Sequence, residues 1–402
     1  MAHRRPPNGA ATVPPNGMAD PASGLLTGKR IALLTASASR AGGGVFESLA
    51  THARLLEGLG ATPIVLAAAD RFSALDRERF GSVSVHSLPV WGGARFACAP
   101  GLSQALRDAQ TDLVHLHGVW QFPSLVAARW ARETGKPCLI SPHGMLEPWI
   151  LARGRWKKAL ARHAFEQANW RTARLFHALC PAEARSIRQA TGRGECTVIA
   201  NPAPPVDAGQ IRQRGPRIVY LGRLHPKKNL PALLAAWAAL DAVRPPQAEL
   251  IVAGWGEDAH VAQLAATIES TPGARFAGPV FGADKQHLLR EAAFLVLPSF
   301  SEGLPMAMLE SWAAGTPTLM SRHCNLDDGF ACGAAIDCGT DQATIAAALH
   351  RALCLSPAQW LAMAHAARAL AAGPYSAATI ARQWEIAYHR LIEEPAERTG
   401  HG

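Results

Sequence analysis

The sequence predicts an α/β protein with two domains, each built on a parallel β-sheet covered by helices. The chain of 402 residues is longer than one hydrophobic core usually serves, so two domains of roughly 150 to 200 residues are expected. Short runs rich in β-branched residues or leucine alternate with longer helical patterns, which is typical of parallel strands joined by helices. The alternation stops at residues 201–205, Asn-Pro-Ala-Pro-Pro, because proline fits neither a helix interior nor an inner strand.

The first domain is expected to occupy residues 29–205. Its apolar runs and helical patterns predict strands at 31–35, 64–68, 113–116 and 138–141, and helices at 45–59 and 124–133. Residues 1–28 contain Pro-Pro-Asn-Gly twice and few apolar side chains. Because such a segment has little to bury, it is expected to form a disordered tail.

The second domain is expected at residues 206–375. Its patterns predict strands at 217–221, 249–253, 274–276, 294–297 and 318–320, and helices at 230–243 and 305–314. Beyond it, residues 376–392 place Ile380, Trp384, Ala387 and Leu391 at helical spacing, which predicts a long amphipathic helix. The pattern does not identify the surface on which this helix packs.

Composition and charge narrow the class of protein. Hydrophobic residues make up 49% and charged residues 18%, and no apolar run approaches the roughly 20 residues that span a bilayer, so a soluble body is expected. The eight cysteines form no C-x-x-C pair and no signal-peptide core lies near the start, which predicts reduced cytosolic thiols. The net charge of +9 favours an acidic partner: a nucleic acid, an anionic membrane or a phosphorylated small molecule.

Basic residues and tryptophans are concentrated in residues 149–174. This stretch holds three tryptophans and a single acid, Glu166, together with seven cations: Arg153, Arg155, Lys157, Lys158, Arg162, Arg171 and Arg174. One interpretation is an interfacial helix resting on anionic lipid, and the other is a solvated helix face above buried tryptophans. Nucleic-acid binding is disfavoured because no recognition motif accompanies the charge.

A candidate phosphate site lies in the second domain, where an apolar strand leads through a polar turn to a helix that begins near Pro305. Proline suits the first helical position, and the free N–H groups of Met306 and Ala307 would then form a phosphate cradle. Glu302 lies in the turn and Glu310 in the helix. These carboxylates could accept hydrogen bonds from ribose or hexose hydroxyls, or they could be ordinary charges near a helix start.

Two further strand-end loops of the second domain are candidates. Gly222, Arg223 and Lys228 lie between a strand and a helix, where cations can neutralise a diphosphate, although exposed basic turns are common. Gly254 belongs to a Gly-x-Gly turn after a strand, which suits close backbone approach to a ligand.

The first domain offers a glycine loop and three histidines. Gly42, Gly43 and Gly44 follow the first strand, but they do not read as G-x-G-x-x-G, so a dinucleotide-binding dehydrogenase is disfavoured. His115 and His117 end one strand, and His143 follows the next. A histidine there could bind a donor or acceptor hydroxyl, or it could be a satisfied core residue. None of the three has metal-ligand spacing with Cys or His partners.

Taken together, these residues resemble a retaining glycosyltransferase of family 4, with the GT-B architecture of two Rossmann-like domains facing across a cleft. The resemblance covers residues 29–391. It is carried by the family's E-x7-E motif, matched by Glu302 and Glu310 with Gly303, Leu304 and Pro305 between them, and it is supported by Gly222-Arg223 and Lys228.

The resemblance implies a role for each candidate residue. Glu302 would bind the donor hexose and Glu310 the ribose, while Arg223 and Lys228 would face the diphosphate. His143 would lie at the sugar near the reaction centre. The donor site would also include Gly222, Gly254, Gly303, Leu304 and the backbone of Met306 and Ala307, and the acceptor or phosphate side would include Gly43, Gly44 and His117.

The resemblance also implies front-face displacement with no metal and no cofactor, and a terminal helix at 376–392 that completes the first domain. Residues 199–202 depart from the Pro-Asn-Gly of many relatives, which affects the linker and the acceptor side. Residues 141–149 and 156–158 resemble members that extend lipid-linked exopolysaccharide or lipopolysaccharide oligosaccharides.

The expected function is transfer of a hexosyl group from a UDP- or GDP-sugar to a glycan acceptor on a polyprenyl diphosphate. The protein would be cytoplasmic and peripheral on the inner face of a bacterial membrane, held there through residues 149–174. Two alternatives are a nucleotide-sugar 2-epimerase and a non-catalytic nucleotide-sugar sensor. The intact Glu302, Glu310, Arg223 and Lys228 argue against the sensor.

Overall fold

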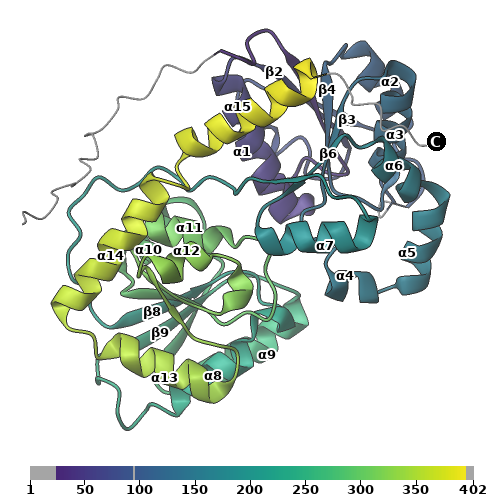
Figure 1. Cartoon of the computed structure of the whole chain (residues 1–402). Coiled ribbons are helices and arrows are strands. Elements are labelled where there is room, and N and C mark those ends of the chain that lie inside the picture. Colours follow the sequence, from purple (N-terminus) through teal and green to yellow (C-terminus); the bar gives the residue numbers. More distant parts are fainter. Residues whose placement is uncertain (1–23, 94–95, 395–402) are drawn as a thin grey trace, which may run out of the picture.

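The computed structural model describes residues 24–93 and 96–394 and contains two α/β domains (Figure 1). The N-terminal sheet has seven parallel strands in the order β3-β2-β1-β4-β5-β6-β7. The C-terminal sheet has six parallel strands in the order β10-β9-β8-β11-β12-β13. The predicted fold class is therefore confirmed.

The N-terminal strands are β1 Arg30–Thr35, β2 Thr62–Ala68, β3 Ser84–Leu88, β4 Leu113–His117, β5 Cys138–Ser141, β6 Leu175–Ala178 and β7 Cys196–Val198. The helical segments between them are η1 Arg40–Gly42, α1 Gly44–Gly58, η2 Arg77–Phe80, α2 Gly101–Asp108, α3 Phe122–Thr134, α4 Pro148–Ala152, α5 Arg155–Ala161, η4 Arg162–Glu166, α6 Gln167–Thr172 and α7 Pro181–Thr191.

The C-terminal strands are β8 Arg217–Leu221, β9 Glu249–Ala253, β10 Ala274–Gly278, β11 Phe294–Leu297, β12 Thr318–Met320 and β13 Ala335–Asp337. The helical segments are η5 Pro226–Lys228, α8 Leu230–Ala238, α9 Asp258–Glu269, α10 Gly282–Glu291, α11 Met306–Ala313, η6 Arg322–Cys324, α12 Asp327–Ala331, α13 Gln342–Leu353, α14 Pro357–Ala372 and α15 Ala377–Glu393.

Both sheets reverse their strand order near the middle. In the N-terminal sheet the reversal lies between β1 and β4, and in the C-terminal sheet it lies between β8 and β11. Loops that leave neighbouring strands in opposite directions open a crevice at the carboxyl ends of those strands, where ligands bind in open α/β sheets. The topology therefore places a candidate ligand crevice in each domain.

Helix α15 returns from the C-terminal domain and lies across the N-terminal one (Figure 1). Its apolar face buries Ile380, Trp384, Tyr388 and Leu391 in the same core as the side chains of α1. The two chain segments that cross between the domains also pair, since the Ala203 N–H donates to the carbonyl of residue 375 at 2.7 Å. The N-terminal domain is thus built from both ends of the described chain.

Residues 24–28 differ from the expected disordered tail. Leu26 is buried in the core beneath α15, and the Leu25 N–H donates to Glu385 Oε1 at 3.0 Å. Two leucines between two glycines form too short an apolar run to predict this packing from the sequence. Residues 1–23 of the predicted tail lie outside the described residues. Among the residues that are described, no helix is long and apolar enough to cross a membrane.

Candidate active site

The centre of the C-terminal half of the site is a buried ion pair between Lys228 and Glu302. Lys228 ends η5 after β8, and Glu302 lies in the loop between β11 and α11. Lys228 Nζ lies 2.5 Å from Glu302 Oε1, and the two side chains are only 12% and 6% exposed. Burying both charges is costly unless each neutralises the other, so the pair fixes the positions of both loops.

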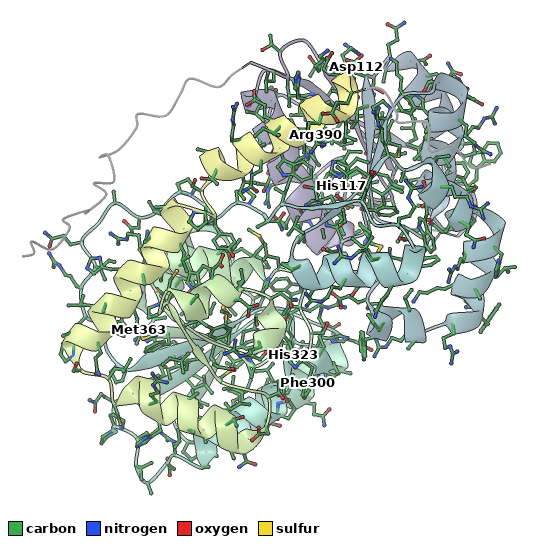
Figure 2. The ribbon with its side chains drawn as sticks, viewed as in Figure 1. Asp112, His117, Phe300, His323, Met363 and Arg390 are labelled. Carbon is green, nitrogen blue, oxygen red and sulfur yellow. The ribbon has the colours of Figure 1, made fainter. Side chains whose placement is uncertain are left out.

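Backbone contacts hold the Glu302 loop. The Phe300 N–H donates to the Lys227 carbonyl at 2.8 Å, and the Glu302 N–H donates to the His323 carbonyl at 3.0 Å. Asn325 Nδ2 donates to the Glu302 carbonyl at 2.6 Å. Figure 2 labels Phe300 and His323 in this domain. The carboxylate is therefore carried by a fixed loop.

Helix α11 starts beside this pair. Pro305 stands at its N-cap, and no side chain of the described residues caps the helix. Met306 and Ala307 are half-buried in its first turn, where backbone N–H groups lack intrahelical acceptors. An uncapped helix start next to a lysine is suited to bind an anion such as a phosphate.

Two other charged residues of this half have different surroundings. Glu310 Oε1 is 2.7 Å from Lys285 Nζ of α10, and both side chains are partly exposed. Arg223 is exposed, and among the described residues it forms no ion pair. Lys285 was missed in the sequence because it lies on another helix, 25 residues from its partner.

Gly254, Gly303 and Leu304 differ in how much space they leave for a ligand. A Cβ built on Gly254 would lie 2.0 Å from the Gly222 carbonyl oxygen, so this glycine is needed for packing between the β8 and β9 loops. The close approach expected at Gly254 is thus made to another loop. Gly303 has open space around it. Leu304 is buried in the domain core, which leaves only its backbone available to a ligand.

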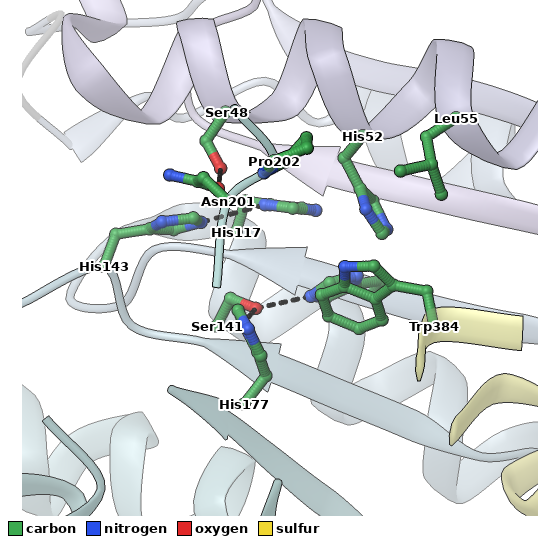
Figure 3. Close-up of a pocket in the computed structure, with 11 residues that line it drawn as sticks. Ser48, His52, Leu55, His117, Ser141, His143, His177, Asn201, Pro202 and Trp384 are labelled. Atoms are coloured by element: carbon green, nitrogen blue, oxygen red, sulfur yellow. Dashed lines mark hydrogen bonds between the residues drawn. The ribbon is translucent and has the colours of Figure 1, made fainter. Parts of the chain in front are cut away.

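In the N-terminal half, His117 and His143 form a hydrogen-bonded pair. His117 ends β4, and His143 lies in the loop after β5 with a left-handed φ of 52°. His117 Nδ1 and His143 Nε2 are 2.9 Å apart (Figure 3). The buried His117 Nε2 has no hydrogen-bond partner among the residues that the structure describes. It belongs to the lining of a small cavity of about 10 Å³ that also includes Ser48 and Asn201.

Behind this pair runs a chain of hydrogen bonds whose direction is fixed at one end. His177 Nε2 contacts the Ile199 carbonyl at 2.8 Å, so it must donate, and His177 Nδ1 must then accept from Ser141 Oγ at 2.7 Å. Ser141 Oγ accepts from His115 Nε2 at 2.6 Å. The chain therefore runs toward the linker between the domains.

The same reasoning extends the chain to α15. His115 Nδ1 must accept from Tyr388 Oη at 2.6 Å, and Tyr388 Oη accepts from His52 Nε2 at 2.7 Å. Burial lowers the pKa of His52 to about 3 and that of His177 to about 4, which keeps both rings neutral. His115 is thus a satisfied core residue. Within the described chain, no group of three or more His, Cys, Asp or Glu residues could hold a metal ion.

Two buried glutamates anchor the loops that carry the paired histidines. Glu183, in the first turn of α7, accepts the Gly144 N–H at 2.5 Å and the Leu179 N–H at 2.8 Å. Glu166 accepts the N–H of Trp120, which has a φ of 74°. Burial raises the pKa of both carboxyl groups. Sequence reasoning missed this role because these glutamates lie 39 and 46 residues from the groups that they bind.

The glycine loop after β1 is open. Gly43 has a φ of 58° and stands at the N-cap of α1. Apart from the adjacent backbone, no atom of the described residues lies within 4 Å of a Cβ built on Gly43 or Gly44. The loop is anchored by Ser37 and Ser39, whose hydroxyls donate to Asp70 at 2.7 and 2.8 Å. Its backbone is therefore both fixed and accessible.

The two halves meet through residues 147–149. Ser301 Oγ, next to Glu302, donates to Glu147 Oε2 at 2.9 Å. The rings of Trp149 and His225 lie 6.4 Å apart, edge to face. The loop that carries His143 thus contacts the two loops that carry Lys228 and Glu302, and the main predicted site residues of both domains lie around one interface.

The basic stretch at 149–174 is not one helix. It folds as α4, α5, the π-helical turn η4 and α6. Trp170 is buried, whereas Trp149, Trp156 and Leu160 are exposed. The Arg153 guanidinium lies 3.8 Å from the centre of the Trp149 ring. Trp170 therefore fits the expectation of a buried tryptophan, whereas Trp149 and Trp156 have the exposure that an interfacial helix would need.

Comparison with known proteins agrees with this architecture. A family model described as "Glycosyl transferase 4-like domain" matches residues 43–202, and one described as "Glycosyl transferases group 1" matches residues 215–354. The crystal structure of Anabaena HepE in complex with UDP-glucose superimposes with a TM-score of 0.69 at 20% identity, covering 89% of this chain and 99% of that one.

Curated relatives match over shorter segments. D-inositol 3-phosphate glycosyltransferase from Salinispora arenicola is 31% identical over 118 residues, 27% of this chain and 26% of the relative. D-inositol 3-phosphate glycosyltransferase 2 from Catenulispora acidiphila is 28% identical over 239 residues, 52% of this chain and 55% of the relative. The chain thus spans about a quarter and about half of these two relatives. Because the two family models match the two domains in succession, the chain belongs to the glycosyltransferases that these models describe.

Proposed function

We propose that this protein transfers a hexosyl group from a UDP- or GDP-sugar to a glycan acceptor, with retention of the anomeric configuration. The observation that carries the proposal is the buried Lys228–Glu302 pair beside the uncapped start of α11. A cation and a helix N-terminus attract a diphosphate, and a carboxylate accepts hydrogen bonds from sugar hydroxyls. The pair and the helix start together offer what a nucleotide-sugar donor would need, which supports the proposal.

The remaining donor contacts follow the same chemistry. Arg223 has an exposed guanidinium for the diphosphate, Glu310 offers a carboxylate for the ribose, and Met306 and Ala307 offer N–H groups for phosphate. The Anabaena HepE crystal structures are complexes with UDP and with UDP-glucose, which supports a donor of this class. His143, across the interface, would contact the sugar near the reaction centre.

We assign no metal ion or cofactor to the reaction. The diphosphate charge would be neutralised by Arg223, Lys228 and the α11 dipole, and the leaving phosphate oxygen would accept the proton of the incoming hydroxyl in a front-face displacement. Transfer should therefore continue in excess EDTA.

The acceptor side of the proposal is a lipid-linked glycan on a polyprenyl diphosphate at the cytoplasmic face of a membrane. Trp156 is 69% exposed and Leu160 66% exposed, and cations surround them along α5. Aromatic and basic side chains together favour an anionic bilayer surface. The protein should co-sediment with vesicles rich in phosphatidylglycerol and should stay in the supernatant with vesicles of phosphatidylcholine. The double variant Trp156→Ala with Lys157→Ala should co-sediment less.

The decisive experiment is acceptor-dependent transfer from a panel of UDP- and GDP-sugars. Glu302→Ala should lower transfer on the order of a hundred- to ten-thousandfold, because it removes charge-assisted hydrogen bonds to the donor. Glu269→Ala, an exposed charge on α9, serves as the matched control and should keep wild-type rates. Unchanged transfer by Glu302→Ala would refute the site.

The same assay separates the two alternatives. A 2-epimerase would convert a nucleotide sugar with no acceptor present, and a non-catalytic sensor would bind the donor without turnover. Release of nucleoside diphosphate that depends on acceptor supports the transferase.

A further inference from the structure

Glu147 is a carboxylate at the interface between the domains that the proposed donor chemistry does not use. It follows His143 by four residues, in the loop after β5, and its Oε2 accepts Ser301 Oγ–H at 2.9 Å across the domain interface. Among the described residues it forms no ion pair, whereas Glu302 beside Ser301 is neutralised by Lys228. An unneutralised, half-buried carboxylate is costly to keep unless it binds something.

The surroundings of Glu147 separate it from the structural glutamates. Glu183 accepts two backbone N–H groups and is almost fully buried, so its hydrogen bonds are satisfied within the domain. Glu147 accepts one hydroxyl, while an ionised carboxylate offers about four acceptor positions. Burial raises the pKa of Glu147, whereas the Ser301 hydrogen bond and the charge of Lys227 lower it, and the charge of Glu302 raises it slightly. The group therefore lies between the donor loops with acceptor capacity unused.

The partner that Glu147 holds indicates the chemistry of its ligand. Ser301 presents an aliphatic hydroxyl to the carboxylate, next to the residue assigned to the donor hexose. A sugar hydroxyl is also an aliphatic alcohol, and it would make the same O–H···O⁻ contact. Because Glu147 belongs to the N-terminal domain, this hydroxyl would belong to the molecule on that side of the interface.

We propose that Glu147 binds a hydroxyl of the acceptor glycan and holds it against the donor sugar at Glu302. The inference rests on the proposed function, since it assigns a residue to the acceptor half of that reaction. On acceptor binding, the acceptor hydroxyl takes the place of Ser301 on the carboxylate. Glu147 contributes a hydrogen bond and removes no proton.

The test measures steady-state transfer against acceptor concentration for Glu147→Gln and Glu147→Ala. Loss of one charge-assisted hydrogen bond should lower kcat/KM for the acceptor about 10- to 100-fold. The Kd for UDP or GDP, whichever nucleotide matches the working donor, should stay within about threefold, as should hydrolysis of the donor without acceptor, because neither measurement involves the acceptor. Glu195→Gln, an exposed glutamate, is the matched control for charge.

Ser301→Ala separates acceptor binding from a purely structural contact between the domains. It removes the observed hydrogen bond but keeps the Glu147 carboxylate. If Glu147 binds the acceptor, Ser301→Ala retains most of the acceptor kcat/KM while Glu147→Ala loses it. Equal losses in both variants would overturn the proposal, as would wild-type kinetics in Glu147→Ala.

Failure of this inference can be told from failure of the proposed function. Acceptor-dependent transfer by the wild type that is abolished in Glu302→Ala and unchanged in Glu147→Ala overturns the role of Glu147 alone. Absence of donor binding and turnover in the wild type overturns both.

Discussion

The two halves of the candidate site satisfy their buried polar groups in opposite ways. The C-terminal half uses charge pairs, Lys228–Glu302 and Lys285–Glu310, beside a helix start. The N-terminal half uses a directional chain of neutral groups from His52 to His177. Cations beside a helix start suit a diphosphate-bearing ligand. The neutral chain instead joins strands β4, β5 and β6 to helices α1 and α15, so its hydrogen bonds are used within the domain.

The largest expected change in stability follows from breaking the Lys228–Glu302 pair of the C-terminal half. Lys228→Ala leaves the Glu302 carboxylate buried without a cation, which should lower the free energy of unfolding by about 3–5 kcal/mol. Lys285→Ala, in the more exposed pair, should cost about 1 kcal/mol or less. Urea denaturation measures both values.

A double variant sharpens this prediction. Lys228→Met with Glu302→Leu removes both charges, so much of the stability lost in Lys228→Ala should return. If Lys228→Ala destabilises the protein no more than Lys285→Ala, the Glu302 loop is solvated and the contrast between the halves fails.

The second prediction concerns the loss of folding stability at low pH that the neutral half should cause. His52 has a folded pKa of about 3, below its usual 6.5, so the unfolded state binds more protons between these values. Stability is therefore complete above pH 6.5 and is lost as the pH falls below it. Between pH 7 and pH 5, this one histidine should lower the free energy of unfolding by about 2 kcal/mol.

His52→Gln provides the measurement. Its free energy of unfolding should fall less between pH 7 and pH 5 than that of the wild type, by about 2 kcal/mol. His86→Gln, at an exposed position on β3, is the control and should keep the wild-type dependence. The same pH dependence in all three proteins would show that His52 is not a neutral group of the core.

Sequence reasoning found more of the charged half than of the neutral one. Glu302 and Glu310 lie in one strand–turn–helix segment, and Lys228 follows a strand by seven residues, so local spacing reveals them. Tyr388 reaches His115 over 273 residues, and Glu183 reaches Gly144 over 39. Such contacts depend on the path of the whole chain, and no short pattern encodes them.

The same limit applies to the fold. Nine strands were predicted, but β3, β6, β7 and β13 were missed. β6 has four residues, one of them a histidine. β3 is half-polar at the edge of its sheet, and β7 and β13 have three residues each. The predicted helix at 230–243 ends at Ala238 in the structure. Edge strands and helix ends depend on neighbours rather than on their own pattern, so sequence reasoning misplaces them first.

The variant with the smallest expected effect on stability is Gly44→Ala, in the glycine loop of the N-terminal half. Gly44 begins α1, and its φ is not left-handed. Within the described part of the chain, only adjacent backbone lies within 4 Å of a Cβ built there. Gly44→Ala should therefore change the free energy of unfolding by no more than about 0.5 kcal/mol. If phosphate or acceptor approaches this backbone, the added methyl group should still lower transfer about tenfold or more, because small displacements of a bound substrate are costly.

Gly58→Ala is the matched control, because Gly58 ends the same helix and also has open space around it. It should leave transfer unchanged. Both variants should unfold at wild-type urea concentrations, so a difference in transfer between them isolates the ligand side of α1. Equal transfer rates in the two variants would show that no ligand approaches Gly44. Gly43 would still need to be glycine, because its φ of 58° is left-handed.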